Sequence, residues 1–212
     1  PKSGALHPAD MQVFQSFVPE LFAGEIQVDM FPFDPLIDSS NVNPENWAKM
    51  AHVVYDNYEK YDGFVILHGT DTMSYSASAL SFMLHNLTKP VVFTGSQLPV
   101  GVLRSDAKEN LLTAIEIAAA KDDMGNAMVP EVTIFMDDEL YRGNRTTKRN
   151  AEHFSAFKSY NYPALARAGV RITYNKQFIA QPNLQEELHL RDKTDCNVAV
   201  LKLFPGITES IV

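Results

Sequence analysis

The sequence predicts an α/β fold, in which a mainly parallel, mixed sheet is covered by helices on both faces. Three observations support this prediction. Four apolar runs, at 26–31, 64–67, 91–93 and 132–136, have the length of strands. A polar loop follows each run, and apolar residues at helical spacing follow the first three loops. Strands that alternate with helices in this order form parallel sheets.

The first helix and strand are expected near the amino-terminal end. Apolar residues spaced by three and four predict an amphipathic helix over 8–22, which Gly24 ends. The run at 26–31 is the first predicted strand. Asn43 before Pro44 is a helix start signal, because asparagine caps a helix and proline fits its first turn.

The run at 64–67 leads into the main site candidate. Its four large apolar residues predict a strand buried on both faces, and the run stops at Gly69. Residues 70–72, Thr-Asp-Thr, come before a helical pattern over 73–87. Ligands of open α/β sheets bind in the turn after a strand, and a helix cap needs one of these side chains rather than three.

The third unit repeats the same order. Residues 94–97 form the polar loop after the strand at 91–93. Asp106 with Glu109 predicts a capping box for the helix that follows and extends to residue 119.

The fourth strand, at 132–136, leads into Asp137 and then a basic segment over 142–149. Right-handed crossovers place the loops after parallel strands along one edge of the sheet. The loops expected to be neighbours are 38–40, 70–72, 94–97 and the Asp137 loop.

The remaining chain has weaker patterns. Residues 170–174 and 187–190 predict two short strands, which we interpret as an antiparallel hairpin. Residues 191–197 are polar enough for a linker, and the apolar run at 198–204 predicts a further strand. The predicted domains are an α/β domain over 1–190 that lacks its first strand, and a linker with the first strand of a smaller C-terminal domain over 191–212. We interpret the sequence as an excerpt of a longer chain.

Composition argues against several partners and compartments. Lysine and arginine number 18 against 26 acidic residues, a net charge of −8, which disfavours nucleic acid and anionic membranes. No apolar run approaches the roughly 18 residues of a membrane-spanning helix. The single cysteine, Cys196, excludes an intramolecular disulfide and fits a reducing compartment.

Motifs for metals and phosphates are absent from the sequence. The six histidines include no i, i+4 pair and the only cysteine has no partner nearby, so a structural metal is not expected. We interpret His68, at the end of the central strand, as a hydrogen-bonded core residue rather than a base. G-x-G-x-x-G, G-x-x-x-x-G-K-[ST] and G-x-S-x-G do not occur.

Hydroxyls, carboxylates and a lysine remain as candidates for chemistry. A threonine hydroxyl is a poor nucleophile until a base takes its proton, and a neutral lysine can do so. Thr70, Asp71 and a lysine from 142–149 would satisfy this logic. The alternative is that the basic segment is a solvated loop.

Four segments carry a resemblance to a known family: DGFVILHGTDTM, PLIDSSNVNPENW, TGSQLPVGVLRSDAKENLLTAI and LYRGNRTTK. They closely resemble the L-asparaginase family, and the DSS and RGNRTTK forms resemble its type I, cytoplasmic branch. The resemblance implies hydrolysis of L-asparagine to L-aspartate and ammonia through a threonine acyl-enzyme, without metal or cofactor. It also implies a second, flavodoxin-like domain and a homo-oligomer, either a dimer or a tetramer.

The resemblance also implies roles for individual residues. Thr70, Asp71 and Lys148 correspond to the catalytic trio. Hydroxyls and carboxylates would hold the amino and carboxylate groups of the substrate, and the Ser96 loop would lie against its amide. The residues implied to bind substrate are Asp38, Ser39, Ser40, Thr70, Asp71 and Ser96.

One part of the family pattern has no counterpart in this sequence. The family's primary nucleophilic threonine comes from a first strand that ends in a Thr-Gly-Gly-Thr-like turn, and a neighbouring subunit's second domain completes the site. Two alternatives therefore stay open. One is the amidotransferase subunit that releases ammonia for transfer RNA charging, which shares the HGTDTM turn, and the other is an amino-acid-binding module without chemistry.

Overall fold

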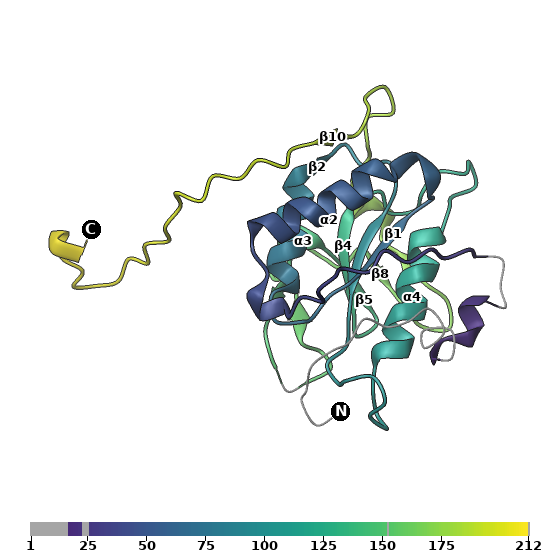
Figure 1. The fold of residues 1–212 in the computed structure, drawn as a ribbon, viewed down its shortest axis with the longest axis horizontal. Coiled ribbons are helices and arrows are strands. Elements are labelled where there is room, and N and C mark those ends of the chain that lie inside the picture. The colour runs from purple at the N-terminus through teal and green to yellow at the C-terminus, as the bar shows by residue number, and fades with distance from the viewer. Residues whose placement is uncertain (1–16, 23–25, 152, 212) are drawn as a thin grey trace.

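The computed structural model describes residues 17–22, 26–151 and 153–211. Its centre is a six-stranded sheet with the strand order β1-β3-β4-β5-β8-β9 (Figure 1). The first three of these strands are parallel, and the remaining neighbours pair antiparallel, which confirms the predicted mixed sheet. The strands are β1 (Phe64–Leu67), β3 (Val91–Thr94), β4 (Val132–Met136), β5 (Glu139–Arg142), β8 (Ala166–Arg167) and β9 (Thr173–Tyr174).

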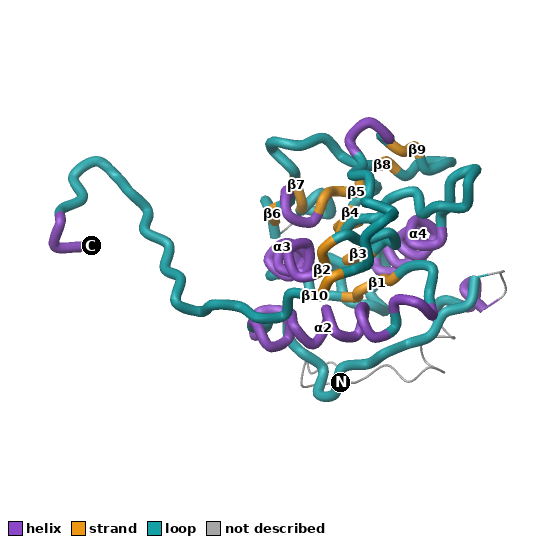
Figure 2. The backbone as a smooth tube through the Cα atoms, turned by 90° about the horizontal axis from the view of Figure 1, so that it is seen from above, coloured by secondary structure: helices purple, strands orange, loops and turns teal. Residues whose placement is uncertain are grey.

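Helices cover both faces of the sheet, as predicted. On one face, α2 (Pro44–Asp56) and α3 (Met73–Met83) form a core with Phe93 and Ile134 of the strands. On the other face, α4 (Ala107–Ala119) packs against Val92 of β3 and Phe135 of β4, which alternate along their strands with Phe93 and Ile134. Figure 2, seen from above, shows α3 and α4 on opposite sides of the strands.

The start of α2 is fixed by the signal that the sequence contains. The Asn43 side chain accepts from the Asn46 backbone N–H at 3.0 Å, and the Asn46 side chain accepts from the Asn43 N–H at 3.0 Å. Pro44 occupies the first turn. This reciprocal capping confirms the predicted helix start.

Two predictions about the first strands were wrong. β1 is not buried on both faces, because Leu67 is 54% exposed and the other three residues are half-buried; among the described strands, β1 lies at the edge of the sheet. Residues 26–31 form no strand, since no ladder joins them to another strand in the described residues. Instead, Val28 and Met30 pack against a small apolar cluster that includes Leu111 of α4.

The predicted helix over 8–22 falls mostly outside the described residues, as does Gly24. Within them, Pro19–Phe22 form a 3-10 helix, η1. Its neighbour Val18 is fully buried against Leu111 and Ile115 of α4.

The predicted hairpin between 170–174 and 187–190 was also wrong. β9 pairs with β8, whereas β10 (His189–Leu190) pairs with β2 (Leu84–His85). Because β2 begins at Leu84, α3 ends four residues before the predicted position at residue 87. Two-residue ladders of this kind leave little trace in the sequence.

β4 and β5 form a tight hairpin. Asp137 and Asp138 occupy its turn with positive φ angles of 51° and 64°, a conformation that asparagine and aspartate tolerate better than most residues. The basic segment continues through η4 (Gly143–Arg145) into β6 (Thr147–Lys148), which pairs with β7 (Phe157–Lys158). The alternative of a solvated loop is therefore wrong for Lys148, whose side chain is 16% exposed, whereas Arg145, Thr147 and Arg149 are exposed.

The C-terminal stretch leads away from the body of the protein (Figures 1 and 2). The predicted strand at 198–204 is extended here without a hydrogen-bonded neighbour, and Val200 is 95% exposed. A 3-10 helix, η6 (Glu209–Ile211), follows. Among the described residues, no helix has the length and apolar character needed to cross a membrane.

Candidate active site

Three segments meet at the carboxyl end of β1. They are the turn 69–72 after β1, the loop 95–97 after β3, and Lys148 of β6. A 3-10 helix, η2 (Ser39–Asn41), packs against the same turn. The prediction that strand-end loops converge on one rim is confirmed for the loops at 38–40, 70–72 and 94–97 by the contacts that follow.

Lys148 joins the two candidate residues of the β1 turn. Its Nζ lies 2.8 Å from Thr70 Oγ1 and 2.7 Å from Asp71 Oδ1. The lysine side chain is 16% exposed, whereas that of Asp71 is 66% exposed. The Lys148 ammonium is therefore mostly shielded from solvent, whereas the Asp71 carboxylate is accessible to solvent and to a ligand.

The hydroxyl of Thr70 has a defined hydrogen-bond direction. Gln97 Nε2 donates to the His153 carbonyl at 3.0 Å, so its Oε1 is left as an acceptor. Thr70 Oγ1 donates to this oxygen at 3.0 Å and accepts from Lys148. The hydroxyl proton consequently points away from the lysine in this arrangement.

The loop that carries Gln97 is anchored by Asp106. The backbone N–H groups of Gln97 and Leu98 donate to its carboxylate at 3.0–3.2 Å, and Asn110 Nδ2 donates at 2.9 Å. Asn110 also donates to the Gly95 carbonyl. Asp106 does precede α4, but its side chain makes no cap bond, so the predicted capping box was wrong.

The turn after β1 packs closely on η2. Thr72 Oγ1 donates to the Ser39 carbonyl at 2.5 Å. A Cβ atom at Gly69 would overlap the Ser39 side chain, so only glycine allows this approach. Ser39 is 6% exposed, and the contact fixes the position of the Thr70 backbone relative to η2.

Asp38 and Ser40 interact with each other at the start of η2. The Asp38 carboxylate accepts from the Ser40 N–H at 2.9 Å and from the Ser40 hydroxyl at 2.8 Å. The hydrogen bond from the Ser40 backbone, followed by that from its hydroxyl, lowers the pKa of Asp38. The carboxylate is thereby kept charged on the rim.

His68 is a hydrogen-bonded core residue, as predicted. Its Nδ1 lies 2.7 Å from the Gly69 carbonyl, which can only accept, so Nδ1 carries a proton. Its Nε2 then accepts from Ser76 Oγ at 2.8 Å, and Ser76 in turn accepts from Trp47 Nε1 at 2.9 Å. Burial lowers the pKa of His68, which favours this neutral form.

The remaining sequence predictions differ in outcome. Ser96 lies half-buried between Gly95 and Gln97, and the hydrogen bond to Thr70 comes from Gln97 rather than Ser96. The Asp137 loop forms the β4–β5 turn, where the Asp138 carbonyl accepts from the Ala168 N–H. Sequence reasoning missed Gln97, Asp106 and Asn110 as site residues, and the signal available for Gln97 was its place in a polar loop directly after a strand.

The described residues contain no group of three or more His, Cys, Asp or Glu side chains arranged to hold a metal ion. The arrangement at the rim instead combines a hydroxyl, an ammonium and a carboxylate. This set can activate a hydroxyl for attack on a carbonyl group once the lysine is neutral.

The chain is similar in sequence to known proteins. The family model described as "Asparaginase, N-terminal" matches residues 2–180. The chain is 48% identical over 180 residues to L-asparaginase 1 of Escherichia coli strain K12, which covers 85% of this chain and 51% of that protein. It is 44% identical over 178 residues to the 60 kDa lysophospholipase of Mus musculus, which covers 84% of this chain and 30% of that protein.

The fold is also similar to that of a solved asparaginase structure. The crystal structure of L-asparaginase I from Vibrio cholerae O1 biovar eltor matches with a TM-score of 0.84 at 41% identity, and the match covers 96% of this chain and 60% of that chain. The chain thus spans about half the length of its Escherichia coli relative.

Proposed function

The chain belongs to the asparaginase family, and from this premise we propose that the protein carrying it hydrolyses L-asparagine to L-aspartate and ammonia. The observation that supports this most directly is the contact of Lys148 Nζ with both Thr70 and Asp71, at 2.8 and 2.7 Å. These residues lie on segments far apart in the sequence, and the motif resemblance assigns them to one catalytic trio.

In the proposed mechanism, Thr70 and Lys148 act together. A neutral Lys148 accepts the hydroxyl proton, and the threonine oxygen attacks the amide carbon to give a tetrahedral adduct. The C–N bond then breaks as the leaving nitrogen takes a proton from Lys148, so that ammonia departs and an acyl-enzyme remains, which water hydrolyses. Thr70 must first release its hydrogen bond to Gln97 and turn its proton toward the lysine. Asp71 orients the Lys148 amine throughout.

The family resemblance adds a second threonine, on a first strand, as the primary nucleophile. In that case, Thr70, Lys148 and Asp71 would serve as the proton relay for the same acyl transfer. Both versions require the Lys148 to Thr70 contact, so both are tested by removing the amine.

Recognition of the substrate follows from the charges on the rim. The Asp71 carboxylate is exposed enough to meet the substrate ammonium, with the charged Asp38 nearby on η2. The hydroxyls of Ser39 and Ser40 are proposed to hold the substrate carboxylate, and the loop at Ser96 is proposed to lie against its amide. This division pairs the substrate ammonium with carboxylates and leaves the amide facing Thr70, and it requires the Ser40 hydroxyl to turn from Asp38 toward the substrate carboxylate.

Further properties of the whole protein are proposed from the family. We propose a cytoplasmic enzyme that needs no cofactor and assembles as a dimer or tetramer. We also propose that residues 191–212 are the linker and first strand of a second, smaller domain.

The test is ammonia release from L-asparagine by the full-length protein. We expect turnover, and a loss of about 10²- to 10⁴-fold in Lys148→Met, which removes the proton acceptor. Lys158→Met is the matched control, because Lys158 lies on β7 directly beside β6 and should keep nearly full activity. Equal loss in both variants would contradict the assignment.

Ammonia release, together with two further measurements, separates the alternatives. Ammonia release that depends on a copurified second subunit would favour the amidotransferase. Asparagine binding in calorimetry without ammonia release would favour a binding module. Fatty-acid release from a lysophospholipid, with asparagine left intact, would contradict the proposal in favour of the activity named for the mouse relative.

A further inference from the structure

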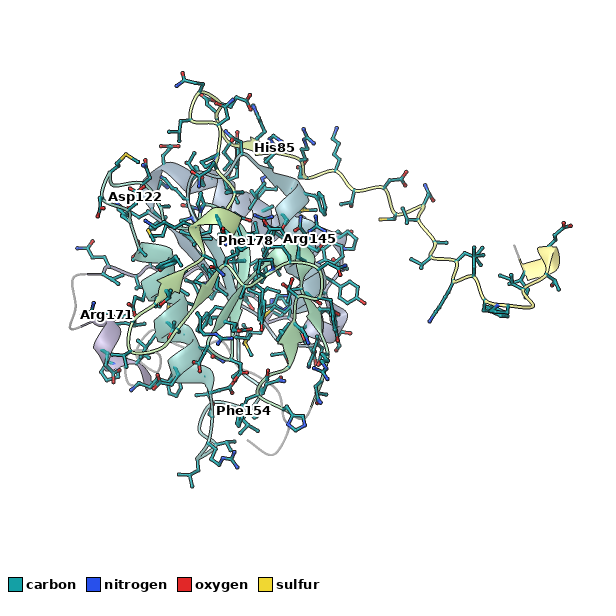
Figure 3. The ribbon with its side chains drawn as sticks, turned by 180° about the vertical axis from the view of Figure 1, so that it is seen from behind. His85, Asp122, Arg145, Phe154, Arg171 and Phe178 are labelled. Carbon is teal, nitrogen blue, oxygen red and sulfur yellow. The ribbon has the colours of Figure 1, made fainter. Side chains whose placement is uncertain are left out.

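Two histidines face each other across the short ladder formed by β2 and β10. The antiparallel register pairs His85 with His189 and Leu84 with Leu190. The two leucines face the main core, so the two histidines lie on the solvent side, and both are exposed. Figure 3 shows His85 at the outer edge of the molecule, near the start of the C-terminal stretch.

The geometry of the pair suits chelation. Residues directly opposite in an antiparallel pair have Cβ atoms about 4.5–5.5 Å apart. The ring centroids are 6.4 Å apart and the ring planes differ by 35°. Both side chains are exposed, and within the described residues neither imidazole forms a hydrogen bond to another side chain or to the backbone.

We propose that His85 and His189 together bind one divalent transition-metal ion. Imidazole suits Cu²⁺, Ni²⁺ and Zn²⁺, and at such nitrogen sites Cu²⁺ binds most tightly of these three ions. Metal–nitrogen bonds of about 2.0–2.1 Å require the rings to approach by roughly 1–2 Å from their present separation, depending on the angle between the two bonds. Rotations about the side-chain torsions of two exposed residues can supply this movement.

The neighbouring groups favour a site of two protein ligands. His52 of α2 is nearby in the fold, but its Nε2 forms a hydrogen bond with Asp192 Oδ2 at 2.9 Å. The Asn86 side chain is held by the backbone carbonyls of Asn183 and Glu186. Water would therefore complete the coordination, as the exposure of both histidines permits.

The position of the site gives metal binding a structural consequence. β2 and β10 share two residue pairs, extended by the hydrogen bond from the Arg191 N–H to the Met83 carbonyl at 2.8 Å. A metal bound by one histidine from each strand would close this ladder. It would hold the chain at the point where the C-terminal stretch leaves the domain.

The test is a titration of the full-length protein with Cu²⁺ in the presence of a weak competing chelator such as glycine. We expect one site per chain, with two nitrogen ligands visible in the electron paramagnetic resonance spectrum. His85→Ala and His189→Ala should each weaken that site at least tenfold. His52→Ala is the matched control and should keep it, because its ring already pairs with Asp192.

A second measurement does not depend on spectroscopy of the metal. Hydrogen exchange at the Arg191 amide should slow severalfold when Cu²⁺ is added to the wild-type protein, and it should not change in His85→Gln. Unchanged Cu²⁺ affinity in both alanine variants would overturn the proposal. So would a Cu²⁺-dependent increase in the size of the assembly in sedimentation, because the metal would then join separate molecules instead of two strands of one chain.

Discussion

The turn 69–72 and the C-terminal stretch 193–211 both lack regular strand pairing, yet they differ in how they are held. In the turn, Thr72 donates to the Ser39 carbonyl and Thr70 lies between Lys148 and Gln97. In the stretch, the apolar side chains at 198–204 are exposed to solvent. Order in an irregular segment therefore comes from contacts with distant parts of the chain rather than from its own secondary structure.

Three substitutions test this comparison, and the largest effect is expected from Gly95→Ala, because Gly95 packs against His68 and Met73, which lie at the two ends of the turn 69–72. A Cβ at this position would overlap the His68 backbone carbonyl and come within 3.0 Å of Met73 Cε. Because backbone cannot move aside cheaply, we expect a loss of about 2–3 kcal/mol in unfolding free energy, measured with denaturant. Gly169→Ala, where the nearest atom is 3.8 Å away, is the control and should change stability by less than about 0.5 kcal/mol.

The second effect concerns activity rather than stability. Gln97→Leu removes the acceptor of the Thr70 hydroxyl and the tie to the His153 carbonyl. We expect kcat for asparagine to fall about tenfold to a hundredfold, with the circular dichroism spectrum unchanged, because the Thr70 side chain loses the contact that sets its rotamer before its proton turns to Lys148. Gln181→Leu, the same change at an exposed position outside the site, should keep the wild-type kcat. A wild-type rate in Gln97→Leu would show that Thr70 is oriented by other groups.

The smallest effect is expected in the C-terminal stretch. Val200 is 95% exposed, so Val200→Thr in the 212-residue chain should change the free energy of unfolding by less than about 0.5 kcal/mol. Denaturant unfolding is again the measurement. A larger loss would show that the stretch docks on the α/β domain, and the contrast with the turn would then disappear.

Much of the sheet could be predicted because its signals are local. The apolar runs of β1, β3 and β4 and the Asn43–Pro44 signal of α2 each depend on a few adjacent residues. The runs at 26–31 and 198–204 have the same local character but form no strand here. Strand formation needs a neighbouring strand, which local sequence does not report.

The site could be predicted in part for the same reason. Thr70 and Asp71 follow a strand directly, so their place at the rim was readable from the pattern. Lys148 was assigned through the family resemblance, because composition alone favoured a solvated loop. The roles of Gln97 and Asp106 depend on side-chain hydrogen bonds between separate loops. The capping-box pattern predicted that Asp106 would cap α4, whereas its carboxylate accepts from the Gln97 backbone.

The β4–β5 turn has a consequence for the order of folding. Asp137 and Asp138 close a hairpin between adjacent segments, which forms on the microsecond scale in isolated chains. The β1–β3 and β3–β4 pairings must wait for crossovers through α3 and α4, and such distant pairings form slowly. We expect the hairpin to belong to the early folding nucleus, so that Thr70 meets Lys148 only when the last parallel strand docks.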